Sequence, residues 1–167
     1  MPTKTVAPFV TTRVFDAPRD RVWAAWTEAE QLKQWFSPRG FQTVQNKLDL
    51  RPGGMYHYCL RMPDGKDMWG KWAIREVAKP KKLVFVVSFS DEKGGITRHP
   101  MNPDWPREIL STVEFEAQGA AKTKVTVTWL PINAGDTELK TFEEGRDSMK
   151  QGWGGTLDNL VTHLPKA

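Results

Sequence analysis

Hydrophobic and polar residues alternate with a period of two over much of the chain. The segments with this pattern are residues 6–15, 41–50, 55–62, 67–77, 82–89, 108–117 and 122–130. In the third segment, Tyr56, Tyr58 and Leu60 fall on one face of a strand, whereas His57 and Cys59 fall on the other. Because the segments are short, evenly spaced and separated by turn residues, they predict a meander of antiparallel strands.

Two short helices are predicted between the first and second strands. Pro18 suits the first helical position, and Val22 and Trp26 follow it at helical spacing. The residues Thr27–Glu30 match a capping box, in which a Thr side chain and a Glu three residues later satisfy free backbone N–H groups. This match predicts that the second helix begins there.

One long amphipathic helix is predicted for the C-terminal third of the chain. Its apolar stripe consists of Leu139, Phe142, Met149, Trp153, Leu157, Leu160 and Leu164. A further capping pattern at Thr141 and Glu144 leaves its start open between residues 137 and 141. The helix also contains Gly145, Gly152, Gly154 and Gly155. Each glycine costs about 1 kcal/mol relative to alanine, which indicates close approach to a sheet surface or to a ligand.

The segment 90–106 reads as a long polar loop with two adjacent glycines and three prolines. A loop of this length in a compact domain is usually functional or mobile, so we expect it to open locally at low free energy. Its histidine, His99, is expected to reach the mouth of a neighbouring pocket.

Composition and charge narrow the class of protein. The 167 residues are 39% apolar and 26% charged with a net charge of +4, which suits a folded domain rather than a disordered chain or a coiled coil. One cysteine excludes an internal disulfide and a cysteine-based zinc cluster. No apolar run approaches the roughly 20 residues of a membrane span, and the N-terminus lacks the apolar core of a signal peptide. We therefore expect a cytoplasmic protein.

Neither the basic residues nor the tryptophans identify a partner on their own. The basic run Lys79–Lys82 is too short to follow many phosphates, so we expect a solvated turn and no nucleic-acid partner. The eight tryptophans and eight phenylalanines are unusual for a chain of this length. Aromatic side chains dominate cores, interfaces and pockets, so a large aromatic core and an aromatic-lined cavity both stay open.

No motif of catalysis or cofactor binding stands out in the chain, and we expect no catalytic residues, no cofactor and no metal. His57 and Cys59 share a strand face, but spacing places no further metal ligand beside them. Glu76 and Asp49 are titratable residues on predicted strands, and both are expected on a solvated outer face.

Short motifs in a fixed order run along the chain from about residue 9 to residue 164. They are Arg13–Pro18, Val22–Trp26, Leu32–Phe41, Asp49–Gly54, Pro63–Gly65, Gly70–Trp72, Pro80–Phe85, Phe89–Glu92, Met149–Trp153 and Leu157–Leu164. In order and spacing they resemble the START-like (SRPBCC) superfamily, most closely the branch named after the activator of the heat-shock protein 90 ATPase. The chain departs from that pattern in the proline-rich stretch Thr97–Pro106 and in the Trp-rich strand Trp69–Trp72.

The resemblance implies an α+β helix-grip fold, with a curved antiparallel sheet wrapped around a long C-terminal helix and two short helices after the first strand. It also implies that residues 1–167 form a single START-like domain with a hydrophobic pocket between sheet and helix. The sequence pattern agrees, because a long amphipathic helix needs a partner for its apolar stripe and a twisted antiparallel sheet provides one.

Large apolar residues from the predicted helices and strands are candidates for the wall of this pocket. They are Trp26, Trp35, Phe36, Tyr56, Tyr58, Trp72, Phe85, Phe89, Met149 and Trp153. Apolar walls with a few polar groups are typical of small-molecule sites. The alternative, in which these side chains simply fill the core, stays open.

These features predict a binding protein for a small hydrophobic or aromatic ligand, without an assigned reaction. An enzyme of the cyclase or hydrolase type acting in the same pocket is an alternative, although the lack of a catalytic constellation disfavours it. A modulator of a chaperone ATPase is a further alternative, disfavoured because no additional docking domain is recognised. As partners, a second copy of the chain in a homodimer and a chaperone both stay open.

Overall fold

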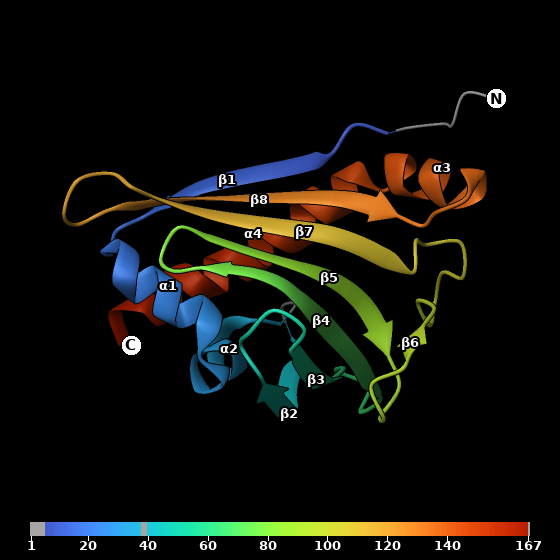
Figure 1. Cartoon of the computed structure of the whole chain (residues 1–167). Helices are drawn as coiled ribbons and strands as arrows, with labels where there is room; N and C mark the ends of the chain where they lie inside the picture. Colours follow the sequence, from blue (N-terminus) through green and yellow to red (C-terminus); the bar gives the residue numbers. More distant parts are fainter. Residues whose placement is uncertain (1–5, 38–39, 167) are drawn as a thin grey trace.

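The computed structural model describes residues 6–37 and 40–166, which form one antiparallel sheet and a set of helices (Figure 1). The strands are β1 (Phe9–Phe15), β2 (Gln42–Leu48), β3 (Met55–Arg61), β4 (Asp67–Ala78), β5 (Lys82–Ser90), β6 (Ile96–Thr97), β7 (Glu108–Ala117) and β8 (Thr123–Ile132). The helices are α1 (Arg19–Thr27), α2 (Ala29–Trp35), α3 (Asp136–Glu144) and α4 (Arg146–His163), followed by the 3-10 turn η1 (Leu164–Lys166). The predicted strands and the two short helices are confirmed, whereas the segment 90–106, which was predicted to be a loop, contains the short strand β6.

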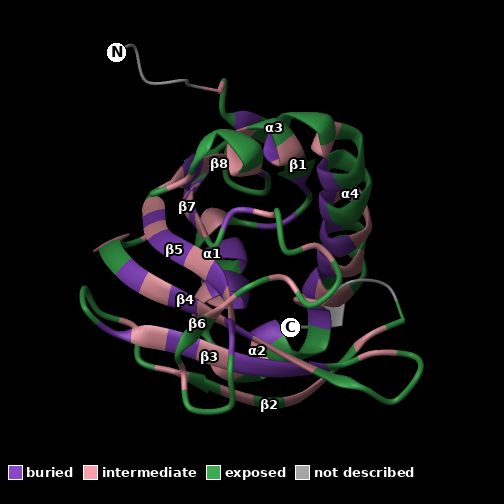
Figure 2. Cartoon of the chain, turned by 90° about the vertical axis from the view of Figure 1, so that its right-hand side faces the viewer, coloured by how far each residue is buried: buried purple, intermediate pink, exposed green. Residues whose placement is uncertain are grey.

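The strand order β1-β8-β7-β5-β4-β3-β2 places the first two strands at opposite edges of the sheet, and the two-residue β6 pairs with β5. Helices α1 and α2 therefore connect one edge to the other. Figure 2 shows the strands curving from β1 and β8 to β2 and β3, with α4 along the open side. This arrangement confirms the helix-grip prediction.

The period-two pattern places large side chains on the concave face of the sheet. Tyr56, Tyr58 and Leu60 of β3 are buried there, and so are Trp72 and Ile74 of β4. These residues form one core with the apolar faces of α1, α2 and α4. The core exists because one face of the sheet and one stripe of each helix exclude water together.

The start of each short helix differs from the prediction by one or two residues. Pro18 is the N-cap of α1 rather than its first helical residue. The predicted capping box is wrong, because Thr27 ends α1 and its hydroxyl donates to the carbonyl oxygen of Trp23 at 2.7 Å. Glu28, whose backbone is extended, separates the two helices and makes no side-chain cap.

The single long C-terminal helix is also corrected, because it is interrupted at Gly145 to give α3 and α4. A Cβ atom on Gly145 would lie 3.1 Å from the Trp105 ring, so a larger residue would crowd this ring. The Gly145 N–H donates to the carbonyls of both Thr141 and Phe142, which tightens the last turn of α3. Among the described helices, none has the length and apolar character that a membrane crossing requires.

Candidate ligand-binding pocket

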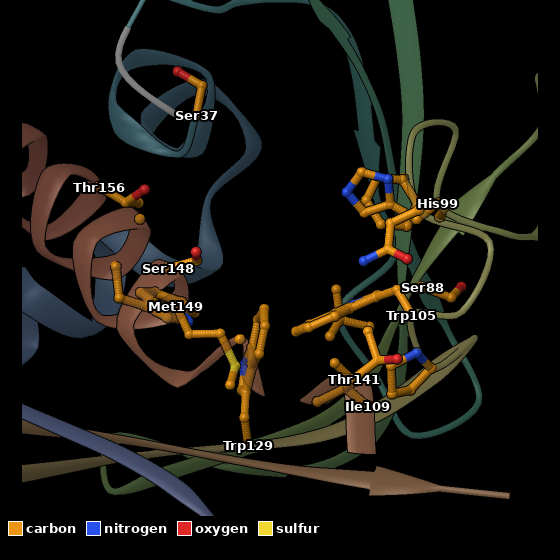
Figure 3. Close-up of a pocket in the computed structure, with 18 of the residues that line it drawn as sticks. Ser37, Ser88, His99, Trp105, Ile109, Trp129, Thr141, Ser148, Met149 and Thr156 are labelled. Carbon is orange, nitrogen blue, oxygen red and sulfur yellow. The ribbon is translucent and has the colours of Figure 1, made fainter. Parts of the chain in front are cut away.

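A pocket of about 440 Å³ lies between the concave face of the sheet, α4 and the loop that joins β6 to β7. Figure 3 shows Thr156 and Ser148 on the helical side, His99 and Trp105 on the opposite side, and Trp129 between them. Ser148 and Gly152 are exposed, so solvent reaches the pocket along α4. The size falls within the range of about 300–1,000 Å³ that is typical of small-molecule sites.

One face of α4 supplies a wall of the pocket. The residues on this face recur at helical spacing and are Ser148, Met149, Gly152, Trp153 and Thr156, and Gly145, the N-cap of α4, extends the wall. A Cβ atom on Gly152, Gly154 or Gly155 would meet no heavy atom within 4 Å. The expected close approach of a sheet to these three glycines is therefore wrong, and Gly152 instead leaves space in the pocket wall.

The sheet supplies the opposite wall at the point where Tyr58, Gly70 and Phe89 pair across β3, β4 and β5. A Cβ atom on Gly70 would lie 2.6 Å from atoms of the Tyr58 side chain. The tyrosine ring therefore covers β4 only because Gly70 has no side chain.

The end of α2 closes the pocket beside Tyr58. The Phe36 ring packs edge-on against Tyr58 at 5.8 Å and against Trp72 at 5.0 Å between ring centroids. The Asn159 side chain of α4 donates to the Ser37 carbonyl oxygen at 3.0 Å. This hydrogen bond holds the end of α2 against α4.

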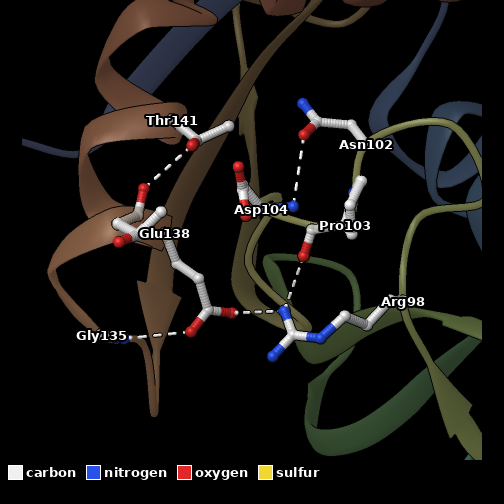
Figure 4. A network of polar contacts seen from close by, with 8 residues as sticks. Arg98, Asn102, Pro103, Asp104, Gly135, Glu138 and Thr141 are labelled. Carbon is white, nitrogen blue, oxygen red and sulfur yellow. Dashed lines mark hydrogen bonds and ion pairs between the residues drawn. The ribbon is translucent and has the colours of Figure 1, made fainter.

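The loop between β6 and β7 is fastened to α3 by an ion pair (Figure 4). Arg98 lies 3.3 Å from the Glu138 carboxylate and donates to the Pro103 carbonyl oxygen at 2.9 Å. Burial alone would raise the pKa of Glu138, but hydrogen bonds from the Gly135 and Arg107 N–H groups and the Arg98 charge lower it overall. These contacts position the residues of the loop that line the pocket, which are His99, Asn102, Trp105 and Pro106.

The ten residues predicted for the pocket divide into two layers. The pocket is lined by Phe36, Tyr58, Phe89, Met149 and Trp153. A second set packs behind that wall in the core and consists of Trp26, Trp35, Tyr56, Trp72 and Phe85. An aromatic core and an aromatic-lined pocket are therefore both present.

Sequence reasoning missed several residues that line the pocket. Trp129 shared an inward-facing pattern with Val125 and Val127, and that alternation was the available signal. Its indole N–H donates to the Ser111 hydroxyl at 3.1 Å, which orients the ring. Trp105 and Asn102 lie in a loop without periodicity, so the sequence carried no comparable signal for them.

The titratable residues considered from the sequence lie away from the pocket, with one exception. Glu76 and Asp49 are exposed and pair with Lys82 and Arg51 respectively. The described residues hold no group of three or more His, Cys, Asp or Glu that could bind a metal. His99 lines the pocket, and burial lowers its pKa.

His57 and Cys59 do not line the pocket either. The His57 ring stacks on Trp69 at 4.9 Å between ring centroids, and its Nε2 atom lies 3.0 Å from the Asp91 carbonyl oxygen. Cys59 is buried, and burial raises the pKa of its thiol, which disfavours the reactive thiolate.

The two tyrosines provide a direct test of the packing behind Phe36. Burial raises the pKa of Tyr56 to about 12, partly offset by the hydrogen bond from Asn46, and burial beside Tyr56 raises the pKa of Tyr58 above its usual range. Each folded-state pKa exceeds the unfolded value of 10.0, so the folded state favours the neutral form of both tyrosines. The stability that the two neutral tyrosines contribute is complete below pH 10 and is lost as the pH rises through about 12.

We therefore expect alkaline unfolding to accompany phenolate formation. The chain has only two tyrosines, Tyr56 and Tyr58, so an increase in absorbance at the phenolate band reports the ionisation of these two residues. Folded protein at pH 10.5 should show almost no phenolate, whereas protein in denaturant should titrate near pH 10. Half-ionised tyrosine at pH 10 in protein that is still folded by circular dichroism would contradict the packing described above.

Comparison with known proteins places this chain in a family. The model of the family described as Activator of Hsp90 ATPase homolog 1-like protein matches residues 16–165. None of the curated protein sequences matches the chain.

Solved bacterial structures share the fold over nearly their whole length. A protein from Nitrosomonas europaea is 24% identical with a TM-score of 0.73, and 95% of this chain aligns with 94% of that one. A protein from Rhizobium leguminosarum is 26% identical with a TM-score of 0.67, over 96% and 95% of the two chains. An AHSA1 protein from Silicibacter pomeroyi is 17% identical with a TM-score of 0.70, over 95% and 98%. The family match covers most of the sequence, so the chain belongs to the Activator of Hsp90 ATPase homolog 1-like family.

Proposed function

We propose that this chain is a binding protein for a small apolar or aromatic molecule, held in the pocket between the sheet and α4. The observation that carries the proposal is an accessible pocket of about 440 Å³ whose wall is built from aromatic rings of separate elements. Rings from the C-cap of α2 and from β3, β5 and α4 contribute to this wall through Phe36, Tyr58, Phe89 and Trp153. Such rings bury large areas of an apolar ligand at a small cost in side-chain entropy.

The polar groups around the pocket favour binding over catalysis. Among the described residues that line it, none is Asp, Glu, Lys or Arg. Thr141 and Ser37 direct their hydroxyl groups to backbone carbonyl oxygens, of Thr137 and Phe41 respectively. Acid–base catalysis would need titratable groups placed against a substrate. Of the described residues that line the pocket, His99 has the pKa nearest to neutral pH, and no carboxylate or ammonium group lies beside it in the pocket wall.

The test fills the pocket with a leucine side chain introduced on α4 and compares this variant with a matched control on the same helix. Gly152 lies at the centre of the pocket-facing stripe, whereas Gly154 lies on another face of the same helix, and each has open space around a Cβ atom. Leucine at either position raises helix propensity by a similar amount. Only Gly152→Leu should place its side chain in the pocket.

We expect wild type and Gly154→Leu to bind the fluorescent probe N-phenyl-1-naphthylamine and Gly152→Leu to bind it about tenfold more weakly or worse. Fluorescence titration gives the three Kd values, and circular dichroism confirms that all three proteins are folded. Native mass spectrometry of the wild type should in addition reveal a co-purified apolar molecule that Gly152→Leu has lost. Equal probe affinity in the two variants, or no binding to the wild type, would refute the proposal.

A further inference from the structure

The loop that forms one end of the pocket presents hydrogen-bond donors rather than acceptors. His99 and Asn102 both line the pocket and both belong to the proline-rich stretch that departs from the family pattern. The His99 ring packs against the Phe89 ring, with 4.6 Å between the ring centroids. Figure 3 places the imidazole across the pocket from Thr156 and Ser148.

The loop backbone determines which His99 nitrogen carries the proton. The Met101 N–H donates to His99 Nδ1 at 3.0 Å, so Nδ1 acts as an acceptor and the proton of the neutral ring lies on Nε2. Burial lowers the pKa of His99, which keeps the ring neutral at neutral pH. No residue of the described ranges forms a hydrogen bond with Nε2, so this N–H is free to bind a ligand.

Asn102 is oriented in the same way. The Asp104 N–H donates to Asn102 Oδ1 at 3.3 Å, as Figure 4 shows, and this contact assigns the amide oxygen to the loop. The amide NH₂ group has no acceptor within the described part of the chain. Both side chains therefore direct their acceptor atoms to the loop backbone and leave N–H groups for the pocket.

The charges around the pocket restrict the complementary ligand group. No Lys or Arg is found among the described residues that line the pocket, so an ionised carboxylate or phosphate on the ligand would be desolvated without a cationic partner. An uncharged oxygen acceptor avoids that penalty and satisfies the two donors. A ligand that offered only N–H or O–H donors at this end would leave both sides unpaired.

Resting on the binding function proposed above, we propose that His99 and Asn102 select flat aromatic ligands that carry an uncharged carbonyl oxygen at the loop end. The aromatic body lies against Tyr58, Phe36 and Trp153, and the carbonyl oxygen accepts from His99 Nε2–H and from the Asn102 amide. The loop is thus the part of the pocket that determines ligand specificity, and α4 and the sheet supply the apolar surface that any member of the class would need.

Two probes of equal shape separate this proposal from the binding function itself. The probe 2-acetylnaphthalene carries the carbonyl oxygen, and 2-isopropenylnaphthalene replaces that oxygen with a methylene group. The variant Asn102→Asp keeps the acceptor for the Asp104 N–H and removes the amide donors. The variant His99→Phe keeps a ring against Phe89 and removes the imidazole N–H, together with the Nδ1 acceptor of the Met101 N–H.

We expect the Kd of 2-acetylnaphthalene to rise about tenfold in each variant, as expected for one lost hydrogen bond, while that of 2-isopropenylnaphthalene stays within about twofold. The quantity to measure is the change in the ratio of the two Kd values between wild type and variant, because the difference in hydration between the probes is the same for both proteins and cancels. Binding of both probes with the same ratio in wild type and variants would overturn the proposal and leave the binding function intact. Failure of the wild type to bind either probe would refute both.

A measurement on the wild type avoids dependence on the folding of the variants. Nitrogen-15 NMR of the imidazole side chains at pH 7.5 should show His99 with its proton on Nε2. Its Nε2 signal should shift with 2-acetylnaphthalene and much less with 2-isopropenylnaphthalene. A proton on Nδ1, or equal shifts with the two probes, would overturn the proposal.

Discussion

Replacing Trp26 with alanine is expected to lower the free energy of unfolding by about 3–5 kcal/mol, the range of large aromatic truncations in cores. The Trp26 side chain is fully buried. Its ring centroid lies 4.8, 6.5, 6.0 and 6.1 Å from those of Trp35, Trp72, Phe115 and Trp153. A cavity at this point would touch α1, α2, β4, β7 and α4 together. Since total stabilities are about 5–15 kcal/mol, the variant should be close to unfolding.

Chemical denaturation of three variants tests this expectation. Trp69→Ala is the control, because Trp69 is only partly buried and stacks on His57 away from the core, and it should cost about 1 kcal/mol. Trp26→Phe should cost less than Trp26→Ala, because it keeps a ring and removes an indole N–H that has no partner among the described residues. Equal losses for Trp26→Ala and Trp69→Ala would show that the core is not centred on Trp26.

Trp153→Ala is expected to change ligand binding more than stability. Trp153 stacks on Trp26 and meets the Trp129 ring edge-on at 5.5 Å between centroids, but it also lines the pocket. Atoms beside a void lack partners on that side, so part of the packing energy is already absent. We therefore expect a stability loss of about 2 kcal/mol, below the range for a fully packed tryptophan. The affinity for N-phenyl-1-naphthylamine should fall about tenfold.

Both quantities should be measured on the same protein, with Trp26→Ala as the reference for a residue behind the wall. Denaturant titration gives the stability, and fluorescence titration under native conditions gives the Kd. A loss of 3–5 kcal/mol with unchanged probe affinity would assign Trp153 to the core and remove it from the proposed site.

Whether a segment forms a helix or a strand could be predicted, because the periodicity of its apolar residues is a local property of the sequence. The alternation of Tyr56, Tyr58 and Leu60 and the helical spacing of Met149, Trp153 and Leu157 each involve residues close in sequence. A side chain's face depends on such spacing alone, so the buried face of β3 and the apolar stripe of α4 agree with the structure. Helix ends were predicted less well. Thr27, for example, has the residue type of an N-cap but is the last residue of α1.

Contacts between residues distant in sequence decided which side chains lie in the core and which line the pocket. Trp26 and Trp153 both belong to apolar stripes, and only the assembled sheet and helices separate the one in the core from the one that lines the pocket. The space beside Gly145, where the helix is interrupted, is bounded by the ring of Trp105, which comes from a loop remote in sequence.

By itself the sequence determined the long strands, the two short helices, the buried faces, the antiparallel meander and the family, because local spacing and motif order carry that information. It did not reveal the break between α3 and α4 or the short strand β6. The tertiary structure alone decided which aromatic rings surround empty space and which polar atoms face it. His99 illustrates the difference: its place in a polar loop is visible in the sequence, but its free N–H depends on the fold of that loop around Met101. Pocket volume depends on how separate segments pack in space, and the hydrogen bonds of His99 and Asn102 depend on the conformation of a loop that has no periodic pattern.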